Sequence, residues 1–219
     1  LALLLLALNT LQRDQRDLQT NPKTLDVTLI ASCKLDYESL PRFARSLRSW
    51  AKVRGVFEIV IVDWLSGVDI KVALEEILPE AQGPKILLIT VPFHTRLPWR
   101  IGAAFNLGLD HAKTPIVGKV DCDTMLSPNF ITVNVLHWAT FRYGDYRASR
   151  RANDRHLNGV FLAWTKHLRG VHGFDERFEL YGWDDSDLYT RLEGHVIHTD
   201  EFEGTRFRAQ NFSSEETLF

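Results

Sequence analysis

Hydrophobic residues in the middle of the chain follow two alternating periods. Four apolar, β-branched runs have the length of buried strands, and they lie at residues 24–33, 57–67, 85–93 and 115–123. Between these runs, apolar residues recur at helical spacing in residues 37–53, 71–78 and 101–112. The pattern therefore predicts strands that alternate with helices.

Such an alternation predicts an α/β fold, with a mostly parallel central sheet and helices on both faces. In sheets of this kind, ligands gather at the carboxyl ends of the strands. Asp63, Asp121 and Asp123 all fall at predicted strand ends. Acids scattered at random in loops would not line up along one edge of a sheet, so their positions are the first indication of function.

The second half of the chain is less periodic. Residues 158–178 predict a strand, a short helix and a loop bracketed by glycines, and residues 182–192 predict a further helix. The segment 142–156 is the most polar and basic part of the chain, and we predict that it forms a loop.

The composition is that of an ordinary globular protein, with 45% hydrophobic and 25% charged residues in 219 positions. This length allows one sizeable core, so we expect one compact domain. Lysine and arginine total 26 against 28 aspartate and glutamate, which gives a formal net charge of -2. Because no long block of like charge occurs, nucleic acid is not expected as a partner.

The two cysteines, Cys33 and Cys122, are too few for a disulfide framework and fit no structural zinc pattern. We predict that both are buried thiols. In the predicted sheet they lie at the ends of neighbouring strands, so a single bridge between them is the alternative.

The opening segment LALLLLAL is apolar but much shorter than the roughly 20 residues that span a bilayer. It is either the trimmed end of a signal anchor or a helix that packs on a core. Because the chain starts at Leu1, we expect a piece of a longer protein, in which residues before Leu1 could mediate membrane association. Asn211 opens a glycosylation sequon, and the sequence leaves both a cytoplasmic and a Golgi-lumenal location open.

Asp121 and Asp123 form a D-x-D pair after a buried strand. In an extended segment, residues two apart point to the same side, about 7 Å apart at their Cα atoms, so both can face one ligand. Mg²⁺ and Mn²⁺ prefer carboxylate oxygens and complete their shell with phosphate oxygens and water. Lys119 offers a competing explanation, because it shares the alternation of Asp121 and could simply neutralise it.

The segment GWDDSDLYTRL, residues 182–192, places Asp184 and Asp185 at a predicted helix N-terminus. Backbone N–H groups and the helix dipole favour carboxylates there, so capping accounts for one of the two acids. Asp187 and Arg191 have the spacing of an i, i+4 ion pair on the helix surface. Asp185 is then the acid most available to act as a general base.

These blocks, in this order and spacing, resemble glycosyltransferases with the GT-A-type fold over residues 25–192. The resemblance is closest to family 2 and to the galactosyltransferase and chondroitin-polymerase type. It implies a single GT-A domain at 24–219, preceded by the helical extension at 1–23 that the apolar opening and the polar, helix-compatible residues after it predict. In that domain, 24–126 would be the nucleotide-sugar-binding half and 127–219 the acceptor-binding half.

The resemblance also implies roles for residues on the donor side. Asp63 would bind the uracil or ribose of a nucleotide sugar, unless it only forms a turn. Asp121 would contact the ribose or a Mn²⁺ or Mg²⁺ ion, and Asp123 would hold that ion, with His198 as the candidate third ligand. Arg100 and Asn106 would assist donor binding, although Asn106 could equally pack within its helix.

On the acceptor side, the resemblance implies that Asp185 is the catalytic base and that Asp184 helps to orient the acceptor. Trp183 and His172 would contact the acceptor sugar, whereas Trp164 fits core packing better.

The sequence thus predicts an inverting, metal-dependent glycosyltransferase of the hexosyl- or N-acetylhexosaminyltransferase class. It would move a sugar from a UDP-sugar to a hydroxyl of a glycan or another acceptor. One alternative is a nucleotidyltransferase, although residues 31–40 lack the glycine-rich phosphate loop expected after the first strand. The other is a non-catalytic module that binds a nucleotide sugar.

Overall fold

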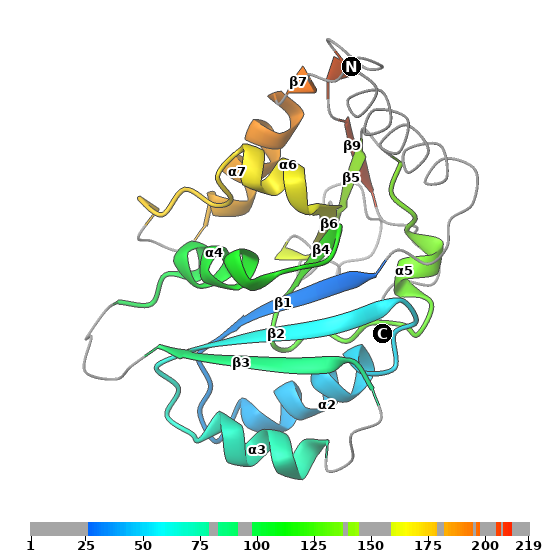
Figure 1. The fold of residues 1–219 in the computed structure, drawn as a ribbon. Helices are drawn as coiled ribbons and strands as arrows, with labels where there is room; N and C mark the ends of the chain where they lie inside the picture. Colours follow the sequence, from blue (N-terminus) through cyan, green and yellow to red (C-terminus); the bar gives the residue numbers. More distant parts are fainter. Residues whose placement is uncertain are drawn as a thin grey trace, which may run out of the picture.

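The computed structural model describes residues 26–78, 83–91, 98–137, 140–144, 159–178, 182–194, 196–197, 205–206 and 208–211. In these residues a seven-stranded sheet has the order β3-β2-β1-β4-β6-β5-β9, and β7 pairs with β8 (Figure 1). The strands are β1 (Val27–Cys33), β2 (Val56–Trp64), β3 (Lys85–Val91), β4 (Ile116–Val120), β5 (Thr140–Tyr143), β6 (Phe161–Trp164), β7 (Val196–Ile197), β8 (Thr205–Arg206) and β9 (Arg208–Asn211). The helices are α2 (Leu40–Trp50), α3 (Ile70–Ile77), α4 (Ile101–His111), α5 (Phe130–Val133), α6 (Thr165–Gly170) and α7 (Asp184–Gly194).

The large sheet is mostly parallel, which confirms the predicted fold class. β3, β2, β1 and β4 run parallel to their neighbours, as do β5 and β9. The direction reverses only where β6 pairs with β4 and with β5. The four strands expected from the hydrophobic runs are therefore the four parallel strands of one side of the sheet.

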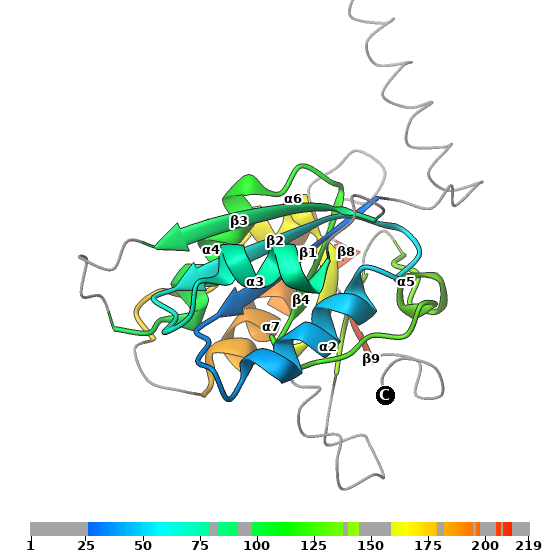
Figure 2. The same ribbon diagram turned by 90° about the horizontal axis from the view of Figure 1, so that it is seen from below.

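Helices cover both faces of the sheet, as the alternating pattern predicts. α2 and α3 lie on one face, and α4, α6 and α7 lie on the other (Figures 1 and 2). α2 buries Phe43, Leu47 and Trp50, three of the residues whose helical spacing marks it in the sequence. α4 packs on β1 and β2. A Cβ atom at Gly108 would overlap Ile30 of β1, so this glycine lets the helix approach the sheet closely.

An aromatic cluster fixes α7 over the second half of the sheet. The ring of Tyr189 lies 4.6 Å from Tyr143, 5.8 Å from Phe141 and 6.0 Å from Phe161, measured between ring centroids. Such rings contribute both a large buried area and a preferred packing geometry. Because Tyr189 is on the second turn of α7, this packing holds the first turn of the helix near the end of β4.

Several predictions fall outside the described residues, namely the extension at 1–23, most of the loop at 142–156, His198, and the last two positions of the sequon. Residues 142 and 143, predicted as loop, instead end β5. This prediction is wrong for those two residues because pairing with β6 and β9 outweighs their polar character. Among the described residues, none of the helices combines the length and the apolar character that a membrane crossing requires.

Candidate active site

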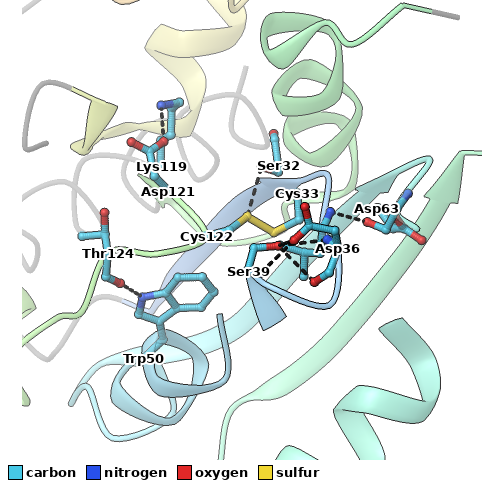
Figure 3. Close-up of a disulfide and its surroundings, with 12 residues drawn as sticks. Ser32, Cys33, Asp36, Ser39, Trp50, Asp63, Lys119, Asp121, Cys122 and Thr124 are labelled. Atoms are coloured by element: carbon cyan, nitrogen blue, oxygen red, sulfur yellow. Dashed lines mark hydrogen bonds and ion pairs between the residues drawn. A yellow bond between two sulfur atoms is a disulfide. The ribbon is translucent and has the colours of Figure 1, made fainter. Parts of the chain in front are cut away.

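The carboxyl ends of β1, β2 and β4 lie at one edge of the sheet, because these neighbouring strands are parallel. Asp63 is opposite Cys33 in the register of β1 and β2, and Asp121 directly follows β4. Figure 3 shows Asp63 and Asp121 on either side of the chain ends that carry Cys33 and Cys122. The edge predicted to bind a ligand therefore exists, and it carries the predicted acids.

Asp63 shapes the turn after β2. Its side chain is buried, and its Oδ1 atom accepts a hydrogen bond from the backbone N of Ser66 at 3.0 Å. The Oγ atom of Ser66 accepts in turn from the backbone N of Leu35, at 2.8 Å, so the loops after β1 and β2 are joined. This is the turn-forming role considered for Asp63. Its role in binding a uracil or ribose stays a prediction.

Cys33 and Cys122 form a disulfide, so the prediction of two free thiols is wrong. Their Cα atoms are 5.9 Å apart, a separation that a disulfide spans without backbone movement. The physical reason is the strand order: β1 and β4 are adjacent and parallel, so the residues at and just after their ends meet. The bond fastens the D-x-D segment to the end of β1 (Figure 3).

A second anchor holds the same segment to α2. The indole N–H of Trp50 donates a hydrogen bond to the carbonyl oxygen of Thr124, at 2.7 Å. The backbone N of Thr124 donates to the carbonyl of Asp121, at 2.9 Å, which closes a turn around Cys122. Within this turn the side chain of Asp121 is 34% exposed and Asp123 is exposed. Asp123 is thus presented to solvent on a firmly held loop, whereas Asp121 is partly buried.

Lys119 is a buried cation in a central strand. Its ammonium donates hydrogen bonds to the carbonyl of Gly159 at 2.6 Å and to Oδ1 of Asp121 at 3.0 Å. Burial lowers the pKa of Lys119, but the nearby carboxylates of Asp121 and Asp185 outweigh it, so the pKa lies above its ordinary value. The competing explanation for Lys119, that it pairs with Asp121, is therefore confirmed.

The same ammonium also faces Asp185 on α7. Its Nζ atom is 3.6 Å from Oδ1 of Asp185, and the side chain of Asp185 is only 17% exposed. Burial raises the pKa of Asp185 to about 6, with a smaller opposing effect from Lys119 and smaller raising effects from Asp184 and Asp121. A carboxyl group with a pKa near neutrality is suited to accept a proton under physiological conditions.

The first turn of α7 carries the other predicted acids. Asp184 is buried at the helix start. Asp187 pairs with Arg191, with 2.8 Å between Nε and Oδ2, which confirms the predicted i, i+4 ion pair. Arg191 also donates to the carbonyls of Val171 and Gly173. Arg191 therefore connects α7 to the loop that contains His172, in addition to pairing with Asp187.

Trp183 and His172 are both exposed, and both adopt a left-handed backbone conformation. Trp183 has φ of 71° and its side chain is 80% exposed, directly before the two acids of α7. His172 has φ of 61°. Non-glycine residues in this region are strained and concentrate at functional sites. Exposure leaves both side chains accessible to a ligand, and their acceptor-binding roles stay predictions.

Asn106 braces the loop before α7. Its amide nitrogen donates to the carbonyl of Phe174 and to Oε1 of Glu176, both at 2.9 Å, and its Oδ1 accepts from the backbone N of Phe174 at 2.8 Å. The side chain thus connects α4 to the loop, which differs from simple packing within the helix. Arg100 is half-buried at the residue before α4. Donor-binding roles for Arg100 and Asn106 stay predictions.

Trp164 takes the core position expected from the sequence. It is buried at the end of β6, and its indole N–H donates to the carbonyl of His137 at 3.1 Å.

The D-x-D pair fits a metal only in part. Within the described part of the chain, no three His, Cys, Asp or Glu side chains form a group that could hold a metal ion. Asp121 is engaged by Lys119, whereas Asp123 is exposed and turned to solvent. Two carboxylates still suit an ion that takes its other ligands from phosphate and water. His198, the candidate third ligand, lies outside the described residues.

Two features of the site escaped the sequence analysis. The contact between Lys119 and Asp185 was missed, although a lysine within a buried strand signals a need for compensating acids. Gly159 was missed altogether: a side chain there would overlap the carboxylate of Asp121. No local pattern marks Gly159, because its role depends on β6 lying beside β4.

A comparison with protein families matches residues 145–213 to a model described as the N-terminal domain of galactosyltransferase. A search of curated protein sequences finds no significant match. The family match covers less than half of the chain, at the end that contains α7.

Solved structures match most of the chain at low sequence identity. A mannosyltransferase from Pyrobaculum calidifontis, in complex with GDP-Man and Mn²⁺, is 16% identical with a TM-score of 0.67, and the match covers 97% of this chain and 64% of that one. A Drosophila β1,4-galactosyltransferase 7 mutant with manganese, UDP-Gal and xylobiose is 12% identical with a TM-score of 0.55, covering 89% and 67%. 4-Diphosphocytidyl-2C-methyl-D-erythritol synthase from Anaerococcus prevotii is 13% identical with a TM-score of 0.57, covering 90% and 91%.

These matches confirm the resemblance to glycosyltransferases with the GT-A fold. At these identities the structural matches establish the fold alone. The chain spans about two thirds of the length of the mannosyltransferase.

Proposed function

We propose that this chain is an inverting, metal-dependent glycosyltransferase, which transfers a sugar from a UDP-sugar to a hydroxyl of a glycan or another acceptor. One observation carries the proposal. At the ligand-binding edge of a GT-A sheet, the acid after β4 and a largely buried acid on α7 converge on one ammonium group, and the acid on α7 has a pKa near 6. The family match to a galactosyltransferase domain includes α7.

The chemistry assigns each acid a task. The carboxylate of Asp185 accepts the proton of the acceptor hydroxyl, and the resulting oxygen forms a bond to the anomeric carbon of the donor. The bond from that carbon to the diphosphate breaks on the opposite face, so a single displacement inverts the configuration. Asp121 and Asp123 face the departing nucleoside diphosphate.

A divalent cation, when bound, would offset the negative charge that builds on the diphosphate. Asp123 is the main protein ligand in this proposal, because it is exposed and adjacent to the anchored turn. Asp121 would be the second protein ligand of the cation, through Oδ2, because Lys119 binds its Oδ1. Mn²⁺ accompanies the nucleotide sugar in two structural neighbours, which supports this choice.

The test is a thermal-shift panel of nucleotide sugars, with and without Mn²⁺, followed by a sugar-transfer assay with the donor that stabilises the protein most. Binding shifts the apparent stability of the folded state, so a metal-dependent shift identifies donor and metal together. A protein that binds a donor but transfers no sugar to any acceptor would be the non-catalytic module considered above.

Nucleotidyl transfer is the second candidate, because the fold match to 4-diphosphocytidyl-2C-methyl-D-erythritol synthase covers 91% of that protein. The two reactions release different products. A glycosyltransferase releases a nucleoside diphosphate from a nucleotide sugar, whereas a nucleotidyltransferase releases pyrophosphate from a nucleoside triphosphate. Pyrophosphate release from UTP or CTP with a sugar phosphate, without diphosphate release from any nucleotide sugar, would favour the second candidate.

A further inference from the structure

Lys119 is a charged residue in a buried central strand, where its charge must be compensated. β4 is hydrogen-bonded to β1 on one side and to β6 on the other, and Lys119 lies opposite Ile30 and Phe161 in these pairings. All five residues of the strand are buried. An ammonium group in such a place is costly unless hydrogen bonds and opposite charges surround it.

The surroundings of Lys119 come from three separate segments. The carbonyl of Gly159, before β6, is 2.6 Å from Nζ; Oδ1 of Asp121, after β4, is 3.0 Å away; and Oδ1 of Asp185, on α7, is 3.6 Å away. The ammonium thus touches both the acid on the donor side and the acid assigned as the base.

The contact with Asp185 is mainly one of charge, because 3.6 Å is longer than an ordinary hydrogen bond. Oδ1 of Asp185 is buried and has no hydrogen-bond partner within the described residues. Lys119 is the one cation within 4 Å of this oxygen in the described part of the chain. Attraction to Lys119 is therefore the interaction that the structure gives this oxygen.

Gly159 leaves space for the Asp121 carboxylate beside Lys119. A Cβ atom at this position would overlap the carboxylate of Asp121, so the absence of a side chain lets that carboxylate lie against the backbone of residue 159. The same residue accepts the hydrogen bond from Lys119. The ammonium and the Asp121 carboxylate are consequently held in place together, next to the first turn of α7.

We propose that Lys119 is a positioning residue, which holds the Asp185 carboxylate at a fixed place beside Asp121 so that proton removal from the acceptor occurs next to the bound donor. The inference rests on the proposed function and deepens it. Lys119 affects proton removal through Asp185 and is not itself a proton acceptor.

The test is a kinetic cycle of four proteins: wild type, Lys119→Gln, Asp185→Asn and the double variant. Lys119→Gln is expected to lower kcat about 10- to 100-fold, as loss of an orienting partner does, with a smaller effect on the donor KM. In the Asp185→Asn background the same substitution is expected to change kcat less than twofold, because the residue through which it acts is gone. Rate losses that multiply in the double variant would overturn the inference.

Two further variants separate positioning from a general structural effect. Lys119→Arg keeps the charge and is expected to recover part of the kcat lost in Lys119→Gln. Lys85→Gln is the matched control, since Lys85 pairs with Glu58 at 3.1 Å on the β3 edge of the sheet. It removes the same charge and is expected to leave kcat within twofold of wild type.

A denaturant-unfolding cycle on the same four proteins does not depend on catalysis. If the ion pair exists, Lys119→Gln destabilises wild type more than it destabilises Asp185→Asn. Should Lys119→Gln fail to fold, recovery of folding in the double variant establishes the same coupling, because the double variant restores the net charge. If the unfolding energies of Lys119 and Asp185 are coupled but the protein transfers no sugar, the proposed function is contradicted and the ion pair is not. If the two residues show no coupling, the inference about Lys119 is overturned, whether or not the protein is active.

Discussion

Cys33 and Cys122 are 89 residues apart in the sequence, and a disulfide joins them at the edge of the sheet where the candidate active site lies. Cys122 stands between the two acids of the D-x-D pair. The bond therefore does two things at once: it closes a long loop of the chain, and it holds Asp121 and Asp123 against the end of β1.

Reduction of this bond is expected to lower both stability and donor affinity. A cross-link over so long a loop typically stabilises a protein by about 2–4 kcal/mol, because it restricts the unfolded chain. We expect the Cys33→Ser/Cys122→Ser variant to unfold at lower denaturant concentration and to bind UDP and Mn²⁺ more weakly. A reducing agent should shift the unfolding midpoint of wild type but not of the variant. Equal midpoints for oxidised and reduced wild type would contradict the bridge.

The rate of sugar transfer is expected to fall as the pH drops below about 6. The pKa of Asp185 is raised to about 6, mainly by burial, and only the deprotonated carboxylate can accept a proton. The measurement is kcat/KM between pH 4.5 and 8 at saturating Mn²⁺. Asp185→Asn should show a low rate with no inflection near pH 6, and an unchanged inflection in that variant would remove Asp185 from the base role.

Replacing Asp185 is expected to stabilise the protein at neutral pH. A carboxyl group whose pKa is raised in the folded state binds its proton more tightly there than in the unfolded state. Its favourable contribution is thus present below about pH 4 and is lost as the pH rises toward 6, by about 2–3 kcal/mol for a shift from 3.8 to about 6. We expect Asp185→Asn to have a higher Tm than wild type at pH 7.5, with the difference shrinking toward pH 4.

A Tm for Asp185→Asn below that of wild type at pH 7.5 would show instead that the charge contact with Lys119 outweighs the cost of burial. Leu188 lies on the same helix and is fully buried, so its replacement shows how much stability the loss of a core side chain removes, independent of charge. Leu188→Ala should cost about 2–5 kcal/mol at every pH tested.

Asp123 is expected to dominate metal binding. Its carboxylate is exposed, whereas the Asp121 carboxylate is held by Lys119. We expect Asp123→Ala to abolish the thermal shift that Mn²⁺ adds to UDP, and its Tm without ligand should match that of wild type. Asp110 is an exposed acid on α4, so Asp110→Ala controls for the loss of one negative charge away from the site. If Mn²⁺ still added its full thermal shift in Asp123→Ala, residues other than Asp123 would have to bind the metal.

Trp183 is expected to contribute to acceptor binding and not to folding. The side chain is 80% exposed, and its left-handed backbone conformation costs a non-glycine residue about 1–2 kcal/mol. Trp183→Gly should therefore keep or raise the Tm while it raises the acceptor KM, with little change in the donor KM. If the acceptor KM stayed constant across several acceptors, the exposed indole would have no part in their recognition.

The sequence by itself determined the local structure. The hydrophobic runs predicted the four parallel strands, and the helical spacing of Leu40, Phe43, Leu47 and Trp50 predicted α2. The pattern also placed Asp63 and the D-x-D pair at strand ends. These features can be predicted from the sequence because the hydrophobic period and the length of a segment depend on its own residues and on whether it is buried.

Only the tertiary structure decided which distant residues meet. The disulfide, the contact of Lys119 with Asp185, and the need for glycine at 159 all depend on the order β1-β4-β6 and on the packing of Tyr189 that holds α7. Sheet order and helix packing arise from the combined burial of many side chains, and no segment of the sequence contains that information alone. The acids and the pairing of Lys119 with Asp121 could thus be found from the sequence, but the contact of the same lysine with Asp185 could not.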